Sequence, residues 1–545
     1  MRENFERAVA NIIKHGDTDI FPYPIENLIF YDKRKETIEL LLELNKDFTD
    51  NLASYPPSNN SALAPVGYTG FRWATRIDPI WNAYFLGLVI SIADKIEEAR
   101  ISKLDNTVFS YRYNWDSDNS DLFDKNYNWR SFMEHSLLQA KKSKWVVVCD
   151  ISEFYPRLGH HKLENALTQL HLPGDQPSKV MKFLANFSGT NSYGIPIGGP
   201  ASRILSELLL NQIDRLLKAE GIVFCRFADD YHLFADNYEQ AFKGLLFLSE
   251  KLLNNQGLQL QKSKTRVMSG QEFVSTSPLA LDDDSPAPIL ALPEGQPPPE
   301  IDKPQAQNLL SFSIRFDPYS PTARDDYETL RKEIQKYDII SLLKAELGKS
   351  RIHISLSKKI VTAIRFIDND RRDDAVLSLV TNSDLLYPIY ANVLIVARAL
   401  YDDLTKATRD LVSENILNLI KNKSHVLQPE LNLAYAIRLI AASEGPEKEE
   451  ALNRVYGETQ SSILRTDIIL TMAKWRASYW LSDLKTKFRT LGPSERRAFI
   501  IASYVLRDEG SHWRDHIKRE LSPFERLVRD WAAQKSSSET WSVPI

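Results

Sequence analysis

Two adjacent aspartates, Asp229 and Asp230, constrain the fold of this chain more than any other feature. Two largely apolar runs flank the pair, Ile222-Val-Phe-Cys-Arg-Phe227 before it and Tyr231-His-Leu-Phe-Ala235 after it. Two apolar runs separated by a short polar step predict a β-hairpin with a tight turn. We therefore expect a hairpin that presents both carboxylates at its tip.

Residues 145–149 form another apolar run, which ends at Asp150. Two strands are thus expected to bring acids to one edge of a sheet. Negatively charged carboxylates that lie close together there raise the free energy of the folded protein unless a cation lies between them. Carboxylate oxygens suit Mg²⁺, with Mn²⁺ as the alternative, and a pair of such ions can activate an attacking hydroxyl and stabilise leaving pyrophosphate. Asp150, Asp229 and Asp230 therefore predict a nucleotide polymerase. The other Asp-Asp pairs, such as Asp402-Asp403, lie in polar or helical surroundings and predict solvated positions.

Four segments in order resemble motifs A, B, C and D of reverse transcriptases. They are Asp150-Ile-Ser-Glu-Phe-Tyr-Pro156, Gly194-Ile-Pro-Ile-Gly-Gly-Pro-Ala-Ser202, Phe227-Ala-Asp-Asp230 and Gly257-Leu-Gln-Leu-Gln-Lys-Ser-Lys-Thr265. Order, spacing and residue types all agree, over about residues 60–270. The resemblance implies dNTPs as substrates, a single-stranded DNA product and an RNA template.

The second motif departs from the common pattern of that family. Pro196-Ile-Gly-Gly-Pro200 lacks the usual glutamine and serine and continues into Ser202-Arg203 and Glu207. This segment resembles the bacterial reverse transcriptases of the defence-associated, abortive-infection branch. The resemblance implies antiphage defence, a helical C-terminal region and a homo-oligomer. Three functions stay open: RNA-templated cDNA synthesis, untemplated or protein-primed extension, and a nucleic-acid-binding scaffold with a vestigial palm.

The resemblance also implies roles for single residues. Asp150 and Asp229 would hold the metal ions together with the main-chain carbonyl of Ile151, and Asp230 would support them. Tyr155 would lie under the sugar and leave no room for a 2′-hydroxyl, although core packing is the alternative. The remaining expected nucleotide contacts are the backbone at Gly198 and Gly199, the amine of Lys264 beside departing pyrophosphate, and the basic residues of the fingers, Arg72, Arg76 and Arg112.

Composition limits where such a protein works. No apolar run reaches the 18 residues of a membrane span, and the first residues lack the apolar core of a signal peptide. Cys149 and Cys225 fall within predicted strands, where buried thiols are expected rather than a disulfide. We expect a cytoplasmic protein without membrane contact. The net charge of −4 does not indicate strong nonspecific binding of duplex nucleic acid.

Composition and periodicity also divide the chain. Residues 1–60 are turn-rich, and 61–270 carry the motifs of fingers and palm. Residues 271–305 are acidic and rich in proline, which predicts a linker. Amphipathic segments with helical spacing recur over 306–545, one of them beginning at Pro493 with Gly510 as its expected end. We expect an α+β chain, with a palm and fingers followed by an all-α helical-repeat (HEAT-like) domain.

Overall fold

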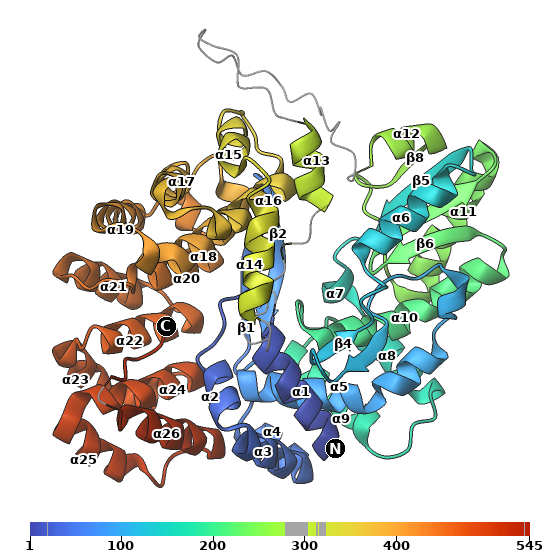
Figure 1. Ribbon diagram of the computed structural model, residues 1–545. Helices are drawn as coiled ribbons and strands as arrows, with labels where there is room; N and C mark the ends of the chain where they lie inside the picture. The colour runs from blue at the N-terminus through green and yellow to red at the C-terminus, as the bar shows by residue number, and fades with distance from the viewer. Residues whose placement is uncertain (19, 278–302, 312–313, 315–322, 539) are drawn as a thin grey trace. The chain divides into compact units, whose positions relative to one another are not determined.

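The computed structural model describes residues 1–18, 20–277, 303–311, 314, 323–538 and 540–545, which fall into two compact units (Figure 1). One unit contains residues 1–61, 74–277 and 517–535; the other contains residues 62–73, the described part of 278–516, and residues 536–545. Each unit therefore joins segments that are distant in sequence. No helix among the described residues is long and apolar enough to span a membrane.

A four-stranded antiparallel sheet lies at the centre of the first unit, in the order β6-β7-β5-β8. Its strands are β5 (Trp145–Asp150), β6 (Val223–Phe227), β7 (Asp230–Ala235) and β8 (Arg266–Ser269). The expected hairpin is β6–β7, with Phe227 opposite Asp230 across a turn of two residues. β5 lies between β7 and β8, so the acids of both runs reach one end of the sheet.

Helices cover both faces of this sheet. On one face, Phe132 and Met133 of α6 (Trp129–Ala140) pack against Val146 and Phe234 in a buried apolar cluster. On the other face lie α10 (Pro200–Ala219) and α11 (Tyr238–Lys251), which contact β6 and β7. The alternation of strand side chains between two faces explains why the runs are continuously apolar: both faces are buried.

Residues 1–60 are largely helical, which corrects the expectation of a turn-rich segment. The helices are α1 (Arg2–His15), α2 (Glu26–Asp32), α3 (Arg34–Lys46) and α4 (Phe48–Ser54). α1 packs closely on α5 (Pro79–Ala99), where a Cβ at Gly87 would lie 2.3 Å from the ring of Phe5. Short helices gain most of their stability from such packing, so their local sequence signal is weak.

Smaller elements complete the first unit. They are β3 (Tyr113–Asp116), β4 (Asp121–Phe123), α7 (Phe154–Arg157), α8 (His160–Gln169), α9 (Gln176–Ser188), α12 (Gly270–Ser275) and, from the C-terminal end of the chain, α26 (Pro523–Ser536). α26 packs beside α2, since Trp531 donates a hydrogen bond of 2.7 Å to Asp32.

The second unit is a stack of helices, which confirms the expected all-α C-terminal region (Figure 1). One row packs in succession: α16 (Ile354–Ala363), α18 (Tyr390–Leu400), α20 (Glu430–Ile440), α22 (Ser462–Lys474) and α24 (Pro493–Ala502). A second row contains α17 (Asn369–Thr381), α19 (Lys406–Lys421) and α21 (Pro446–Glu458). Each helix contacts its neighbours in the row, as in a solenoid.

The other helices of this unit are α13 (Lys303–Ser311), α14 (Ala323–Ile334), α15 (Ile339–Leu347), α23 (Ser478–Thr486) and α25 (Arg507–Ile517). The two-stranded hairpin of β1 (Asn60–Val66) and β2 (Gly70–Arg76) contributes its residues 62–73 to this unit, and its outer ends, residues 60–61 and 74–76, belong to the first unit. Tyr68 at the hairpin turn donates a hydrogen bond of 2.8 Å to the carbonyl of Leu385. Most of the linker predicted at 271–305 lies outside the described residues, and its first residues belong to α12.

Candidate active site

Three aspartates meet at the end of the central sheet. Asp150, the last residue of β5, lies directly opposite Asp230, the first residue of β7. Asp229 occupies the turn between β6 and β7, and its carbonyl accepts a hydrogen bond of 3.2 Å from the amide of Ile151. The other turn residue, Ala228, has φ of 53°, a left-handed conformation that alanine rarely adopts. The sheet thus gathers all three acids that the sequence singled out.

Burial and neighbouring negative charge raise the pKa of two of these acids, Asp229 and Asp230. Burial, followed by the charge of Asp150, raises the pKa of Asp229 to about 6. Burial, followed by the charges of Asp229 and Asp150, raises the pKa of Asp230 to about 7. The Lys264 ammonium acts in the opposite direction on both, and its Nζ lies 3.1 Å from Asp150 Oδ2. A site in which negative charge is this costly has a strong electrostatic preference for cations.

The oxygen atoms of this site fit a divalent ion that takes some of its ligands from the protein and others from a bound substrate. Carboxylate and main-chain oxygens are the ligands that Mg²⁺ and Mn²⁺ prefer. No three Asp, Glu, His or Cys side chains among the described residues converge into a complete metal cage. An ion held here by Asp150 and Asp229 would therefore take its remaining ligands from the backbone, from water and from phosphate oxygens, as Mg²⁺ commonly does at phosphoryl-transfer sites.

Tyr155 lies close to this cluster. It lies within the motif that begins at Asp150, in α7, and the centroid of its ring lies 5.0 Å from that of Phe154. Burial raises the pKa of the Tyr155 phenol well above its usual value, and Tyr111 and Asp229 add to the effect. The structure therefore brings a largely buried aromatic ring into the electrostatic range of Asp229.

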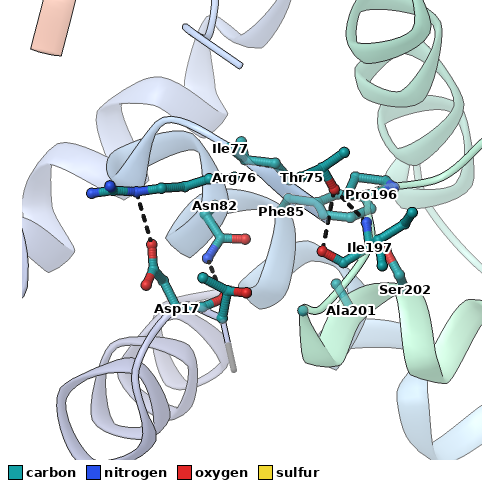
Figure 2. Close-up of a pocket in the computed structure, with 12 residues that line it drawn as sticks. Asp17, Thr75, Arg76, Ile77, Asn82, Phe85, Pro196, Ile197, Ala201 and Ser202 are labelled. Carbon is teal, nitrogen blue, oxygen red and sulfur yellow. Dashed lines mark hydrogen bonds and ion pairs between the residues drawn. The ribbon is translucent and has the colours of Figure 1, made fainter. Parts of the chain in front are cut away.

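Residues 196–202, the second motif, border a small polar cavity in the first unit (Figure 2). Gly198 has φ of 103°, a conformation that favours glycine, and Gly199 precedes the first residue of α10. The hydroxyl of Thr75 donates a hydrogen bond of 3.2 Å to the carbonyl of Ile197 and accepts one from its amide. The strand residue next to Arg76 thus fixes the loop of the second motif.

Asp17, from the N-terminal segment, lies in the same cavity. Its carboxylate is 3.7 Å from the guanidinium of Arg76, and its carbonyl accepts a hydrogen bond from Asn82 (Figure 2). Burial raises the pKa of Asp17 above its usual value. Asp17 Oδ1 and Ser202 Oγ have no hydrogen-bond partner in the described protein, and the cavity of ≈ 10 Å³ has room for about one water molecule between such groups. Sequence reasoning missed Asp17 because the contact is long-range.

The other two arginines expected at the nucleotide are Arg112 and Arg72. The Arg112 side chain is 1% exposed and pairs with Glu97 at 3.1 Å. Burial and the nearby Arg100 lower its pKa. These contacts favour a structural role for Arg112, and its contact with a triphosphate stays a prediction. Arg72 is exposed on β2 and belongs to the second unit.

A buried ion-pair network behind the turn also escaped the sequence analysis. Arg226, fully buried in β6, donates to Glu207 at 2.8 and 3.0 Å and to Asp214 at 2.6 and 2.8 Å, both on α10. Arg226 also donates a hydrogen bond of 3.0 Å to the carbonyl of Ala228. The sequence did contain one signal of this network, a single arginine within the largely apolar run 222–227. A charged side chain in a buried strand requires an oppositely charged partner.

Comparison with known proteins agrees with this geometry. Residues 88–304 match the family described as reverse transcriptase (RNA-dependent DNA polymerase). No curated protein is similar enough to match the chain in sequence.

Similar solved structures include telomerase of Candida albicans in complex with a TWJ fragment of telomeric RNA. The sequence identity is 11%, the match covers 72% of this chain and 70% of that chain, and the TM-score is 0.29. Apo telomerase of Candida tropicalis is another, at 11% identity, 78% and 71% coverage and a TM-score of 0.30. These scores are low, so the likeness extends to neither substrate nor partner. The family match and the acidic hairpin together carry the assignment: the chain contains a reverse transcriptase domain and is an enzyme of the RNA-directed DNA polymerase class.

Proposed function

We propose that the protein adds dNTPs to a growing DNA strand by two-metal-ion catalysis at Asp150 and Asp229. The observation that carries the proposal is the gathering of three carboxylates on adjacent strands, with raised pKa values for Asp229 and Asp230. Mg²⁺, or Mn²⁺ in its place, would polarise the attacking hydroxyl and stabilise the charge on the leaving pyrophosphate. Asp150 and Asp229 would hold these ions with the carbonyl of Ile151, and Asp230 would tune the local field.

Residues around the acids would position the nucleotide. Lys264 would donate a proton to departing pyrophosphate, and its support is a side chain that is 64% exposed and paired with Asp150. Arg76 would contact the triphosphate from its place beside Asp17, and the exposed Arg72 would act from β2. Both assignments rest on the presence of these cations in the fingers segment.

Two further features would select and seat the nucleotide. Tyr155 would exclude a 2′-hydroxyl by filling the space beneath the sugar. Gly198 and Gly199 would let the backbone approach the new base pair. A Cβ at Gly199 would meet the carbonyl of Asp17 at an ordinary 3.9 Å, so the chain's own packing does not demand glycine there. Close approach of a substrate supplies a reason for it.

Synthesis without a template, primed by a hydroxyl of the protein itself, is part of the same proposal. Its support is the departure of the second motif at Ile197 and Gly199 and the net charge of −4, which does not favour a long primer–template duplex. A protein hydroxyl is the same nucleophile chemically as a primer 3′-hydroxyl. The resemblance of that motif to abortive-infection enzymes supports a homo-oligomeric enzyme of bacterial antiphage defence, acting in the cytoplasm.

Two alternatives make different predictions. Conventional RNA-templated synthesis requires an RNA and follows its sequence. A vestigial palm that only binds nucleic acid would incorporate nothing. The cost of keeping three mutually repelling carboxylates together argues against the vestigial palm, because a site without cations would be more stable with neutral residues.

The test incubates purified full-length protein with Mg²⁺ and one labelled dNTP at a time, with and without RNA. Incorporation without RNA, in a product that migrates with the protein on a denaturing gel and shifts after nuclease but not after mild base, supports protein priming. Incorporation that follows an added RNA sequence on free 5′ ends supports the templated alternative. The Asp229→Asn protein is the matched control, and equal incorporation by that variant would refute the metal assignment.

A further inference from the structure

A cationic cavity of ≈ 570 Å³ lies in the second unit. Its wall consists of the end of α22, the start of α23, the segment 504–506 with the start of α25, and the C-terminal residues Ser536, Ser538, Trp541, Ser542 and Val543. Lys474, Arg476 and Arg507 line it together with Glu509. Cavities of this volume accommodate small organic ligands.

The charges of this cavity are not balanced. In the part of the chain that the structure describes, neither an ion pair nor a hydrogen bond links Lys474, Arg476 or Arg507 to a carboxylate. The acidic residue in the wall, Glu509, is held by Lys485 and by Ser482 at 2.8 Å. Burial and the charge of Arg398 lower the pKa of Lys474, while the charge of Asp402, which lies 3.9 Å from Arg398, acts in the opposite direction. Three cations around one cavity that make no direct contact with a carboxylate favour an anion.

Backbone strain coincides with the same two arginines. Arg476 has φ of 55°, and Arg507 has φ of 42° with ψ of −124°. Residues other than glycine pay about 1–3 kcal/mol for such conformations. Arginine has no local advantage over glycine at either position, so the backbone conformation does not account for the two guanidinium groups.

The cavity also has an aromatic wall. Trp541 lines it and is half-buried, and Tyr504 lines it from the segment before α25. The Tyr504 ring already faces the guanidinium of Arg514 at 3.8 Å, which leaves Trp541 to present an apolar surface to a ligand. Indole rings stack on nucleobases of any sequence.

We propose that this cavity binds a nucleotide phosphate between Arg476 and Arg507, with the base against Trp541. The same chemistry is offered by a free nucleotide and by the phosphorylated 5′ end of a DNA strand. The residues of this cavity belong to the second unit and those of the Asp150–Asp229 cluster to the first, and the proposal does not depend on the proposed polymerisation.

The test measures thermal unfolding and binding of full-length protein in EDTA, where metal-dependent triphosphate binding at the acidic cluster is absent. The probes are dAMP, deoxyadenosine, and an oligothymidylate with and without a 5′-phosphate. dAMP should raise the melting temperature and deoxyadenosine should not. Binding of the 5′-phosphorylated strand as well as dAMP would assign the site to strand ends, whereas binding of dAMP alone would assign it to free nucleotides; both outcomes support the proposal.

Glycine variants separate a ligand role from a structural role. Arg476→Gly and Arg507→Gly remove a charge but relieve the strain, so the unliganded protein should melt at an equal or higher temperature while dAMP binding weakens roughly tenfold or more. Lys423→Gly is the matched control, because Lys423 is also a cation with positive φ, 48°, but pairs with Glu458 outside the cavity. Its dAMP affinity should equal that of the wild type.

Unchanged dAMP affinity in both arginine variants would overturn the proposal. Stabilisation by a short polyglutamate peptide but by neither phosphate-bearing probe would also overturn it, because the cavity would then serve an acidic protein segment.

Discussion

The guanidinium of Arg226 donates a hydrogen bond to the carbonyl oxygen of Ala228, at 3.0 Å, immediately before Asp229 in the chain. Ala228 holds the left-handed conformation that the two-residue turn requires. The same guanidinium is clamped by Glu207 and Asp214 on α10. The turn that carries Asp229 is therefore tied to the helix that follows the second motif.

Removing the clamp should destabilise the protein strongly. Arg226→Met leaves Glu207 and Asp214 buried with reduced compensation, and breaking a buried pair in this way costs about 3–5 kcal/mol. Urea unfolding of the full chain would measure the loss. Arg157→Gln removes an exposed ion pair with Glu153 in the same unit and should change stability by less than about 1 kcal/mol. Equal effects of the two substitutions would contradict the structural role of Arg226.

Neutralising the acids of the cluster should abolish catalysis without unfolding the protein. Asp150→Asn and Asp229→Asn each remove a charged metal ligand, and the reacting oxygens lose their alignment. Incorporation of labelled dNTP should fall at least about a thousandfold. Asp236→Asn, at an exposed acid just beyond β7, should keep normal activity. Normal activity of the Asp229 variant would remove this residue from the site.

The pH dependence of stability follows from the raised pKa of Asp230, about 7 in the folded protein. A carboxyl that is harder to ionise when folded destabilises the protein as pH rises from its unfolded pKa, near 4, through 7. Without metal, Asp230→Asn should therefore exceed the wild type in stability at pH 8, by at most about 4 kcal/mol, and match it near pH 4. Thermal unfolding in EDTA across this range tests the sign, and a gap that widens toward acid would refute it.

Tyr155 should decide between deoxyribonucleotides and ribonucleotides. Tyr155→Val shortens the side chain and opens space beneath C2′, so the ratio of kcat/KM for dNTP over NTP should fall by about tenfold or more. Tyr155→Phe keeps the ring and should preserve the ratio. If the valine variant is less stable than the wild type but discriminates as before, Tyr155 is a packing residue only.

Arg112 and Arg76 should behave differently although both belong to the expected fingers. Arg112→Gln breaks the buried pair with Glu97 and should lower stability with little change in KM for dNTP. Arg76→Gln should raise KM for dNTP. Steady-state kinetics combined with urea unfolding separates the two effects, and a raised KM at an unaltered stability in the Arg112 variant would support its nucleotide role.

Local patterns in the sequence were sufficient for the palm and for the C-terminal helices. The apolar runs 222–227 and 231–235 predict β6–β7 because side-chain alternation and turn length are local properties. The helix expected to begin at Pro493 is α24, which confirms that start. Its expected end at Gly510 is wrong, because α24 stops at Ala502 and Gly510 lies within α25. A proline at the first position marks the start of a helix locally, whereas the end of a helix depends more on how the helix packs.

The sequence by itself thus determined that Asp150 ends a strand and that Asp229 and Asp230 lie at the tip of a hairpin, since largely apolar runs flank them. Only the tertiary structure decided what surrounds them. The contact of Asp17 with Arg76 spans the N-terminal helices and the fingers, and the clamp on Arg226 comes from α10. The cavity of Arg476 and Arg507 needs the returning C-terminal residues. Such contacts depend on how segments that are distant in sequence pack together. The periodicity and spacing of residues within one segment do not predict this packing.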